Sequence, residues 1–208
     1  MNKPKRDAKA TQQKIIKEAR RLFSLNGFDA TTIDDIAKYS GVNKALIYYY
    51  FQNKHGLYTK IMSDLFDSIY DTVVKEQKKC KSSMDELEKF ILTYAKYAYK
   101  NRYFPALLLR EFSNNGVHLS DALFANMKKL YVLLSDILTK GEKQEVFKPS
   151  IPMVIHFMII GTLNLMVATK PLRVKATETD GIDTCLDCSA DEISAYVFQT
   201  IKKSLEVK

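Results

Sequence analysis

The sequence predicts an all-α protein, and three observations lead to that prediction. Only 7 Gly and 5 Pro occur in 208 residues, so few positions would break a long helix. Apolar residues recur at steps of three and four along most of the chain, which is the spacing of an amphipathic helix. No stretch of any length alternates apolar and polar residues as a half-buried strand does, and no glycine-rich phosphate-binding loop occurs.

The first expected helix covers residues 11–26. Its apolar stripe consists of Ile15, Ala19, Leu22 and Phe23. Gly27 is expected to end it, because glycine readily adopts the positive φ found just past a helix end. Residues 1–10 are basic and lack the apolar spacing, so we expect a disordered arm there, with an arm that binds phosphate groups as the alternative.

Residues 31–57 contain two short helical patterns separated by a tight turn. Thr31 or Thr32 can cap the first helix, because a hydroxyl accepts a hydrogen bond from an unpaired backbone N–H. Gly41 can end that helix, and Asn43 can cap the second one, which runs into a cluster of three tyrosines. Helix, glycine-containing turn and helix form the helix-turn-helix layout, in which the second helix enters the major groove of DNA.

Longer helices are expected in the rest of the chain. Asn53 can cap a helix whose apolar residues recur every four positions, and this helix links the helix-turn-helix to the remaining fold. Ser83 is expected to cap the next helix, and Gly141 to end a later one. The further helices are expected at residues 83–101, 106–112, 120–140, 150–168 and 190–206, with residues 169–189 irregular.

The positive charge of the chain is concentrated at its N-terminal end. Residues 1–60 carry 12 Lys and Arg against 5 Asp and Glu, a net charge of +7. The other 148 residues carry 20 against 19, a net charge of +1. A basic segment beside a nearly neutral one indicates a polyanionic partner for that segment, whereas a generally basic protein would disperse its charge.

Several classes of protein fit the sequence poorly. The charged start of the chain does not read as a signal peptide, so we expect a cytoplasmic protein. The apolar run at residues 151–168 is about long enough to cross a bilayer, but Pro152, His156 and Asn164 favour a buried helix over a membrane span. No paired carboxylates, nucleophile motif or metal-binding cluster stands out. We therefore expect neither an enzyme nor a cofactor, and no catalytic or metal-binding residues.

Cys185 and Cys188 form a C-x-x-C pair. This spacing serves thiol redox chemistry or half of a zinc site. The sequence does not bring two further zinc ligands near it, and the βαβ context of a redox motif is lacking. Incidental cysteines in a loop are the favoured interpretation, and a sensing role is the alternative.

Five pieces of sequence lie at a fixed spacing over about 30 residues around the helix-turn-helix. They are Gly-Phe at 27–28, Thr-Thr-Ile-Asp-Asp-Ile-Ala at 31–37, Ser-Gly-Val at 40–42, Asn-Lys-Ala-Leu-Ile-Tyr-Tyr-Tyr-Phe at 43–51 and Asn-Lys-His-Gly-Leu at 53–57. Together they closely resemble the DNA-binding domain of the TetR family of transcriptional regulators. Tyr39 and Tyr50 depart from the usual family pattern without breaking either helix.

The resemblance implies an all-α homodimer with a three-helix DNA-binding domain at residues 1–52 and a helical effector-binding and dimerisation domain at residues 53–208. The last two long helices would form the dimer bundle. The implied function is ligand-responsive transcriptional regulation. A repressor would bind a pseudo-palindromic operator in double-stranded DNA as a dimer, and a small hydrophobic effector would release it. The alternative is a ligand-independent regulator, or one that senses thiol oxidation or metal through Cys185 and Cys188.

The resemblance also divides the expected DNA contacts into two sets. Lys44, Ala45 and Leu46 are expected to read base edges, with partial burial in the core as the alternative for Leu46. The residues expected to hold phosphates and position the helix are Thr32, Tyr48, Tyr49 and Lys54, while Tyr50 is ambiguous between phosphate and core, and Asn43 caps the helix. For Thr32, capping alone is the alternative.

Aromatic and methionine side chains in the second domain could line an apolar effector pocket. The candidates are Tyr94, Tyr97, Phe104, Leu108, Phe112, Tyr131, Met153, His156 and Phe157. Plain core packing is the alternative for each of them. His156 could instead be a buried polar group with a hydrogen-bond partner.

Overall fold

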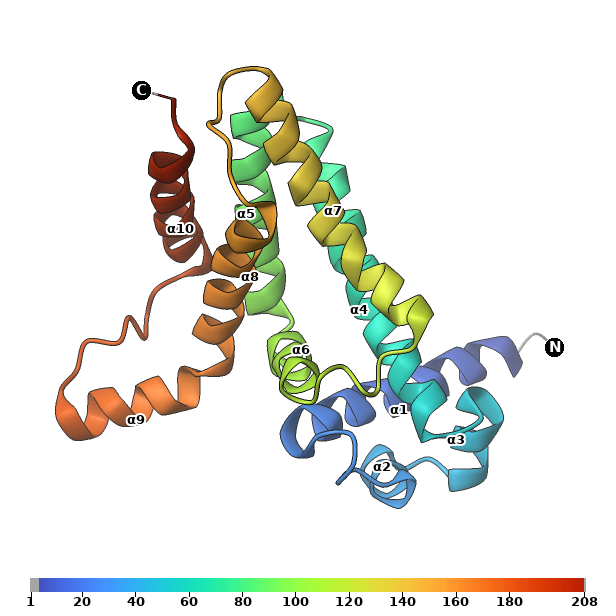
Figure 1. The fold of residues 1–208 in the computed structure, drawn as a ribbon. Helices are drawn as coiled ribbons and strands as arrows, with labels where there is room; N and C mark the ends of the chain where they lie inside the picture. The colour runs from blue at the N-terminus through green and yellow to red at the C-terminus, as the bar shows by residue number, and fades with distance from the viewer. Residues whose placement is uncertain (1–3, 208) are drawn as a thin grey trace. The chain divides into compact units, whose positions relative to one another are not determined.

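The computed structural model describes residues 4–207, and within that range the chain is helical (Figure 1). The helices are α1 (Pro4–Asn26), α2 (Ile33–Ser40), α3 (Lys44–Phe51), α4 (Lys54–Gln77), α5 (Ser83–Lys100), α6 (Tyr103–Ser113), α7 (Asp121–Lys143), α8 (Pro152–Ala168), α9 (Lys170–Asp180) and α10 (Ala190–Leu205). The β-type pairing found in the described range is one bridge between Phe147 and Glu206. The all-α prediction is confirmed.

The helices form two compact units. The first consists of the chain up to Phe66 together with Ala106–Phe124, and the second consists of Asp67–Pro105 together with the chain from Ala125 onward. Helices α4, α6 and α7 therefore each contribute to both units. The predicted boundary between residues 52 and 53 separates the DNA-binding part from the effector-binding part, and both residues lie in the first compact unit. This functional boundary stays a prediction.

The core of the first unit lies where α1, α2 and α3 meet. The predicted stripe of α1 is buried, with each of its four side chains at most 4% exposed. Ile36 from α2 and Ile47 from α3 are also buried, so each short helix turns one apolar face inward. Tyr58 from the start of α4 contacts Phe23 edge-on, with ring centroids 5.1 Å apart. The three helices and the first turns of α4 therefore share one core.

The predicted caps of the helix-turn-helix are present. Thr32 accepts a hydrogen bond from the backbone N–H of Asp35, and the Asp35 carboxylate accepts one from the backbone N–H of Thr32. Gly41 follows α2 with φ 66°, a left-handed conformation that costs glycine little. Asn43 accepts the backbone N–H of the second residue of α3 at 2.8 Å, and Asn53 accepts that of the third residue of α4, Gly56, at 2.8 Å.

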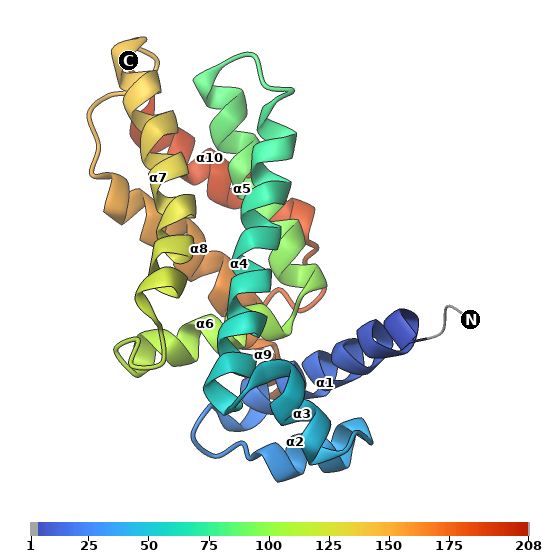
Figure 2. The same ribbon diagram turned by 90° about the vertical axis from the view of Figure 1, so that its right-hand side faces the viewer.

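The second unit is organised around α5, which packs against α8 and α10 (Figures 1 and 2). Phe90 and Ile91 from α5 are fully buried. Tyr94 is also buried, and its hydroxyl exchanges hydrogen bonds with the side-chain amide of Asn164 on α8 at 3.0 and 3.2 Å. Burial raises the pKa of Tyr94, so this hydroxyl stays protonated. Asn164 therefore has a partner inside the core.

The predictions for the N-terminal arm, for residues 170–180 and for the cap of α5 are wrong. The arm at residues 1–10 is not disordered from Pro4 onward, because α1 begins there with a proline, whose fixed φ suits a first helical turn. Residues 1–3 of that arm lie outside the described residues. Residues 170–180 are not irregular but form α9, which Gly181 ends in a left-handed conformation. Ser82 rather than Ser83 caps α5, because Ser83 is buried and donates to Gln144 instead.

Gly141 does not end its helix, since α7 continues to Lys143. A Cβ atom at this position would lie 2.0 Å from the ring of Phe147. Phe147 is only 2% exposed. The glycine therefore makes room for a buried aromatic ring rather than supplying a turn.

Within residues 4–207, none of the helices taken singly has the length and apolar character needed to cross a membrane. Helices α8 and α9 would meet those requirements only if joined, and they are bent by 63° at their junction.

Candidate nucleic-acid interface

One face of α3 is exposed and carries most of the residues predicted to contact DNA. Ile47 and Phe51 face the core, four positions apart, which turns the rest of this eight-residue helix outward. Tyr49 is 78% exposed, and Tyr48 and Leu46 are exposed to 44% and 40%. Asn43, Lys44 and Ala45 are exposed as well. The first turns of α3 therefore present an ammonium group, two phenols and two small or apolar side chains to solvent.

Lys44 forms an ion pair with Asp34 on α2, at 2.8 Å between Nζ and the nearest carboxylate oxygen. The hydrogen bond to Asp34 raises the pKa of Lys44. Both side chains are well exposed, at 45% and 73%, so the pair itself adds little to stability. Asp34 nevertheless neutralises part of the charge that Lys44 would offer to a phosphate or a guanine edge.

The three tyrosines of α3 occupy different environments. Tyr48 and Tyr49 are exposed, whereas Tyr50 is half-buried and its ring meets that of Tyr49 at 5.2 Å and that of Phe51 at 6.3 Å. A phenol combines an apolar ring with a polar tip, so it can pack on the helix and still reach a phosphate. Tyr50 is placed between the exposed face and the core.

Thr32 uses its hydroxyl within the chain. The Oγ1 atom accepts the backbone N–H of Asp35 and donates to the Asp35 carboxylate at 2.6 Å. The pKa of Asp35 is lowered by the hydrogen bond that its carboxylate accepts from this hydroxyl and then by the one it accepts from the backbone N–H of Thr32. The structure thus gives Thr32 its capping role, while a phosphate contact stays a prediction.

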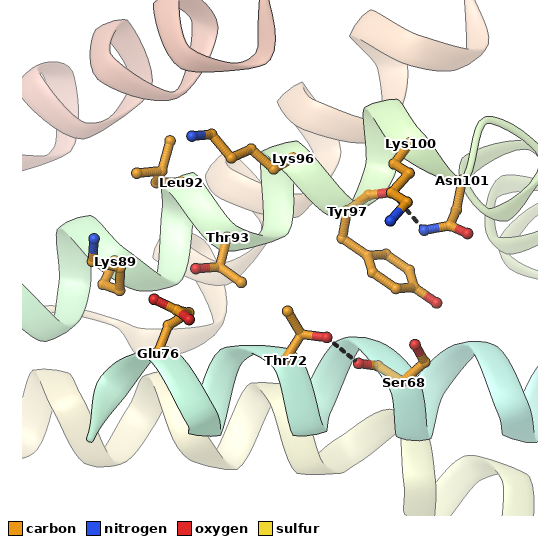
Figure 3. A pocket seen from close by; sticks show the side chains of 10 residues that line it. All are labelled: Ser68, Thr72, Glu76, Lys89, Leu92, Thr93, Lys96, Tyr97, Lys100 and Asn101. Carbon is orange, nitrogen blue, oxygen red and sulfur yellow. Dashed lines mark hydrogen bonds between the residues drawn. The ribbon is translucent and has the colours of Figure 1, made fainter. Parts of the chain in front are cut away.

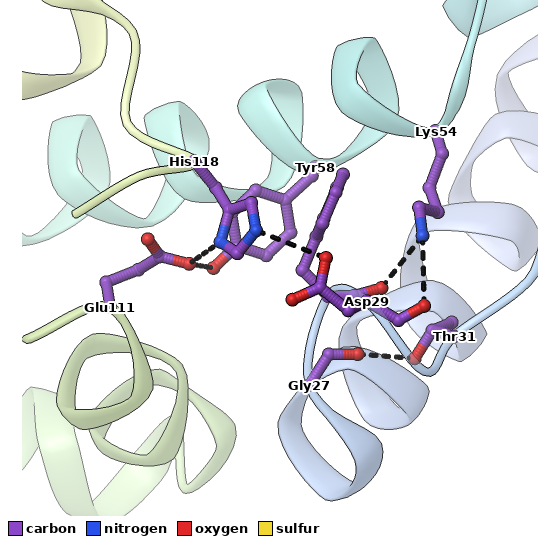
Figure 4. Close-up of polar contacts among 8 residues, drawn as sticks. Gly27, Asp29, Thr31, Lys54, Tyr58, Glu111 and His118 are labelled. Carbon is purple, nitrogen blue, oxygen red and sulfur yellow. Dashed lines mark hydrogen bonds and ion pairs between the residues drawn. The ribbon is translucent and has the colours of Figure 1, made fainter. Parts of the chain in front are cut away.

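Lys54, the first residue of α4, has a role in the chain that the sequence did not reveal. Its ammonium group donates to the backbone carbonyls of Phe28 and Asp29 at 3.0 and 3.3 Å (Figure 4). It also lies 4.3 Å from the centre of the Phe28 ring, within range of a cation–π interaction. Lys54 therefore ties the start of α4 to the loop before α2, and its phosphate contact stays a prediction.

A group of polar side chains, which we call the Glu111 cluster, lies next to this loop. It comprises Asp29, Tyr58, Glu111 and His118 (Figure 4). Glu111 on α6 is 1% exposed and accepts a hydrogen bond from the Tyr58 hydroxyl on α4. His118 lies 3.2 Å from the same carboxylate oxygen through Nδ1 and 3.5 Å from the Asp29 carboxylate through Nε2. The cluster joins α4, α6 and the loop before α2.

Three members of the Glu111 cluster, Tyr58, Glu111 and His118, are buried, whereas Asp29 is exposed. Burial, followed by the hydrogen bond to Glu111, raises the pKa of Tyr58, so the phenol remains a donor at physiological pH. The second carboxylate oxygen of Glu111 is buried without a hydrogen-bond partner in the described structure. This site was missed from the sequence, and the signal that could have indicated it is the pair of charged residues, Arg110 and Glu111, among the apolar residues of 107–112.

Arg110 adds a further connection within the first unit. Its guanidinium group donates to the backbone carbonyls of Ser24 at 3.2 Å and Leu25 at 2.6 Å, at the end of α1. These carbonyls belong to the last turn of a helix, where a cation satisfies unpaired acceptors. The C-terminal end of α1 is therefore held by α6.

The structure divides the nine residues predicted to line an effector pocket. Leu108 and Phe112 belong to the first unit, and the other seven belong to the second. Tyr94, Tyr97 and Phe104 pack together in the core, with Phe104 touching both tyrosines. Tyr131 and His156 contact each other at 5.6 Å between ring centres, and Met153 and Phe157 are exposed. A shared apolar cavity lined by these residues stays a prediction.

A groove of about 480 Å³ lies between α4 and α5 in the second unit (Figure 3). Its lining residues are Ser68, Thr72, Glu76, Lys89, Leu92, Thr93, Lys96, Tyr97, Lys100 and Asn101. Tyr97 is the one residue of the predicted pocket among them. The groove is polar and basic, which differs from the hydrophobic pocket that the sequence led us to expect.

Cys185 and Cys188 are joined by a disulfide in the loop between α9 and α10. Arg173 on α9 donates hydrogen bonds to the backbone carbonyls of Thr184 and Cys185 at 2.8 and 3.0 Å, which holds this loop against the helix. Among residues 4–207, no three His, Cys, Asp or Glu side chains are grouped so that they could hold a metal ion. The zinc alternative for the C-x-x-C pair therefore gains no support from the geometry.

Comparison with known proteins places this architecture in a family. Residues 15–61 match the family described as bacterial regulatory proteins, tetR family. The biofilm operon icaADBC HTH-type negative transcriptional regulator IcaR of Staphylococcus aureus is 31% identical over 129 residues, which cover 62% of this chain and 68% of that protein.

Two solved structures share the fold. A TetR family transcription regulator from Marinobacter aquaeolei VT8 aligns over 99% of this chain and 100% of its own, with a TM-score of 0.76 and 16% identity. The transcriptional regulator FadR from Bacillus subtilis, solved in complex with stearoyl-CoA, aligns over 92% of this chain and 98% of its own, with a TM-score of 0.73 and 19% identity. The chain belongs to the TetR family of DNA-binding transcriptional regulators.

Proposed function

We propose that the protein is a ligand-responsive repressor that acts in the cytoplasm and binds a pseudo-palindromic operator as a homodimer. The observation that carries the proposal is the exposed face of α3, which presents Lys44, Tyr48 and Tyr49 on a segment with a net charge of +7. The name of the Staphylococcus aureus relative, a negative transcriptional regulator, supports repression rather than activation.

In this proposal α3 enters the major groove of the operator. Lys44 reads a guanine edge, and Ala45 and Leu46 contact thymine methyl groups. Tyr48 and Tyr49 donate to phosphates on either side, which fixes the position of the helix but carries no sequence information. Asn43 holds the first turn of α3 through its cap, so the reading residues stay on a rigid element.

The homodimer is proposed to form through α8 and α10. The exposed apolar residues of α8 recur at helical spacing, and they are Met153, Val154, Phe157, Met158 and Leu165. Gly161 lies among them, and the space beside its Cα atom is open, so a partner helix can approach closely. Tyr196 on α10 is 76% exposed. A continuous apolar surface of this kind marks an interface, and a two-fold dimer would bury the same surface of both copies.

Coupling between effector and operator is proposed to run through α4 and α6, which contribute to both compact units. In the first unit Lys54, Arg110 and the Glu111 cluster fasten these helices to the end of α1 and to the loop before α2. A tilt of α4 would therefore move α3 with it and change the spacing of the two recognition helices in the dimer. An effector that favours the mismatched spacing lowers operator affinity, typically by about 5–150-fold.

Selection of DNA from a random duplex library tests the proposal. The full chain should enrich an inverted repeat whose half-sites are separated by about one helical turn or a multiple of it. Binding to the enriched duplex should weaken with salt, with log K falling by about 0.9 per phosphate neutralised. Enrichment of no sequence, or an affinity that is indifferent to salt, would contradict the proposal.

A second candidate function is thiol control of the same DNA binding, which the disulfide between Cys185 and Cys188 favours. Reduction would open the loop that Arg173 holds against α9. Operator affinity would then differ between the reduced and the oxidised protein. A variant with both cysteines replaced by serine should lose that difference, and equal affinities in the wild type would rule the candidate out.

A further inference from the structure

The groove between α4 and α5 has two walls of different character. Ser68, Thr72 and Glu76 line it from α4, one turn apart from each other. The other wall comes from α5 and the residue that follows it, and three of its side chains are lysines (Figure 3). Leu92 is the aliphatic residue of this lining. The surface suits a polar ligand better than a fatty one.

The lysines give the groove an excess of positive charge. Lys96 is paired with Asp191 at 2.7 Å, whereas Lys89 and Lys100 have no ion pair in the part of the chain that the structure describes. The pKa of Glu76 is lowered, mainly by its hydrogen bond from Lys79 and further by nearby lysine charges that include Lys89. An anion in the groove would feel the same positive field.

Thr93 adds a hydroxyl group to the groove wall. This residue is only 7% exposed and lies on the groove wall. Its hydroxyl makes no hydrogen bond to any of residues 4–207. Its Oγ1 atom is not among the buried side-chain atoms that lack a partner, so it is open to the groove and can bond to a ligand. Figure 3 shows Thr93 and Tyr97 extending from α5 toward Thr72 and Ser68 on α4, so polar groups converge from both walls.

We propose that this groove binds a small hydroxylated anion of the sugar-phosphate class. Lysine ammonium groups serve as point charges for phosphate. Lys89 and Lys100 lie at opposite ends of the groove (Figure 3), so one or the other would hold the phosphate end of the ligand. The hydroxyl of Thr93 and the amide of Asn101 would bond to ligand hydroxyl groups. A volume of about 480 Å³ is in the range of small-molecule sites.

The claim that this groove binds a ligand stands on the groove alone. The claim that the groove is the effector site of the repressor rests on the proposed ligand response. Because the groove lies between α4 and α5, a ligand there would contact the helix that carries the proposed coupling. The effector would then be polar and anionic, which differs from the hydrophobic effector expected from the family resemblance.

The test is a titration of the full-length protein, without DNA, with glucose 6-phosphate, followed by backbone amide NMR. We expect saturable shifts centred on residues of the groove, weaker binding of inorganic phosphate and no binding of glucose. The double substitution Lys89→Gln and Lys100→Gln should weaken binding by about tenfold or more, which is about 1.4 kcal/mol. Thr93→Val keeps the shape of the side chain and should weaken binding by a smaller factor.

Lys203→Gln, on the exposed surface of α10, is the matched control and should bind as the wild type does. Absence of saturable shifts with glucose 6-phosphate would overturn the site, as would unchanged affinity in the double lysine variant. Operator affinity is then measured with and without glucose 6-phosphate. If glucose 6-phosphate binds but does not change operator affinity, the groove is a binding site but not the effector site. This conclusion about ligand binding does not depend on the result of the DNA selection.

Discussion

The exposed faces of α3 and α8 are both rich in large side chains, but their chemistry differs. On α3, Tyr48 and Tyr49 end in hydroxyl groups and follow a lysine. On α8, the exposed side chains include Phe157 and Leu165, which are 57% and 49% exposed and have no polar atoms. Exposure alone therefore does not define a function. The polar tips on α3 suit a charged polymer, whereas the face of α8 suits a second copy of the same apolar surface.

The two faces also differ in the residues that contact and position their side chains. Asn43 caps α3, and Asp34 holds Lys44, so the polar side chains sit on a short, fixed element. On α8, His156 lies beside the exposed face and contacts Tyr131 and Phe157 through its ring. Burial lowers the pKa of His156 to about 4, so this side chain is neutral at neutral pH. His156 is the one titratable side chain of α8, so the helix carries no side-chain charge at that pH.

The largest effect should come from placing a charge on the face of α8. In Phe157→Glu, both copies of the dimer would bury a carboxylate in an apolar surface, which costs several kcal/mol. We expect the dimer to dissociate about 100-fold or more readily, measured by analytical ultracentrifugation. Val117→Glu, at an apolar residue of the first unit that is 71% exposed, is the control. An unchanged dimer in Phe157→Glu would show that α8 is not the interface.

The next effect should come from the reading residue of α3. Lys44→Ala should weaken operator binding by about 1–3 kcal/mol and relax the preference for guanine at one position of each half-site. Asp34→Asn removes the ion pair and leaves the ammonium group, so its operator affinity should equal or exceed that of the wild type. Fluorescence anisotropy with matched and mismatched duplexes measures both. If Lys44→Ala weakens all duplexes equally, Lys44 contacts only phosphate.

Acid should weaken the fold through His156. The unfolded chain protonates this residue near pH 6.5 and the folded chain only near pH 4, so the unfolded state binds more protons between these values. Stability is therefore complete above about pH 6.5 and falls as the pH is lowered toward 4.

Between pH 7 and pH 5, His156 should lower the free energy of unfolding by about 1–2 kcal/mol, a range that allows for partial solvent access. His156→Phe should reduce the pH dependence by that amount in urea unfolding at fixed protein concentration. His55→Gln, at an exposed histidine, is the matched control. Equal pH dependence in His156→Phe and the wild type would remove His156 as the cause.

The smallest effect on DNA affinity should come from removing one tyrosine hydroxyl, and two tyrosines of nearly equal exposure allow a comparison. Tyr49 on α3 and Tyr196 on α10 are 78% and 76% exposed. Tyr49→Phe should weaken binding to every duplex by about 1 kcal/mol, the size of one hydrogen bond, without changing sequence preference. Tyr196→Phe keeps the apolar ring in the proposed dimer surface and removes only a hydroxyl far from α3 in the sequence, so DNA binding should stay unchanged. Equal affinities for the two variants would remove the Tyr49 hydroxyl from the interface.

Local signals explain which parts of the fold could be predicted. The caps at Thr32 and Asn43 and the left-handed Gly41 depend on residues within a few positions of each other, so the sequence was enough to predict them, with Thr31 as the alternative to Thr32. Gly141 was misread because its function depends on Phe147 packing against it from the following loop. Helix α9 was missed because its sequence is polar and has no buried residue to give an apolar period.

The candidate sites show the same division. The sequence by itself determined the all-α class, the helix-turn-helix with its spacing and the concentration of positive charge at the N-terminal end, because each is a property of neighbouring residues. Only the tertiary structure decided that Tyr58 and Glu111, 53 positions apart, share a hydrogen bond. It also decided that lysines of α5 line a groove with hydroxyls of α4, since no local pattern encodes which distant side chains meet.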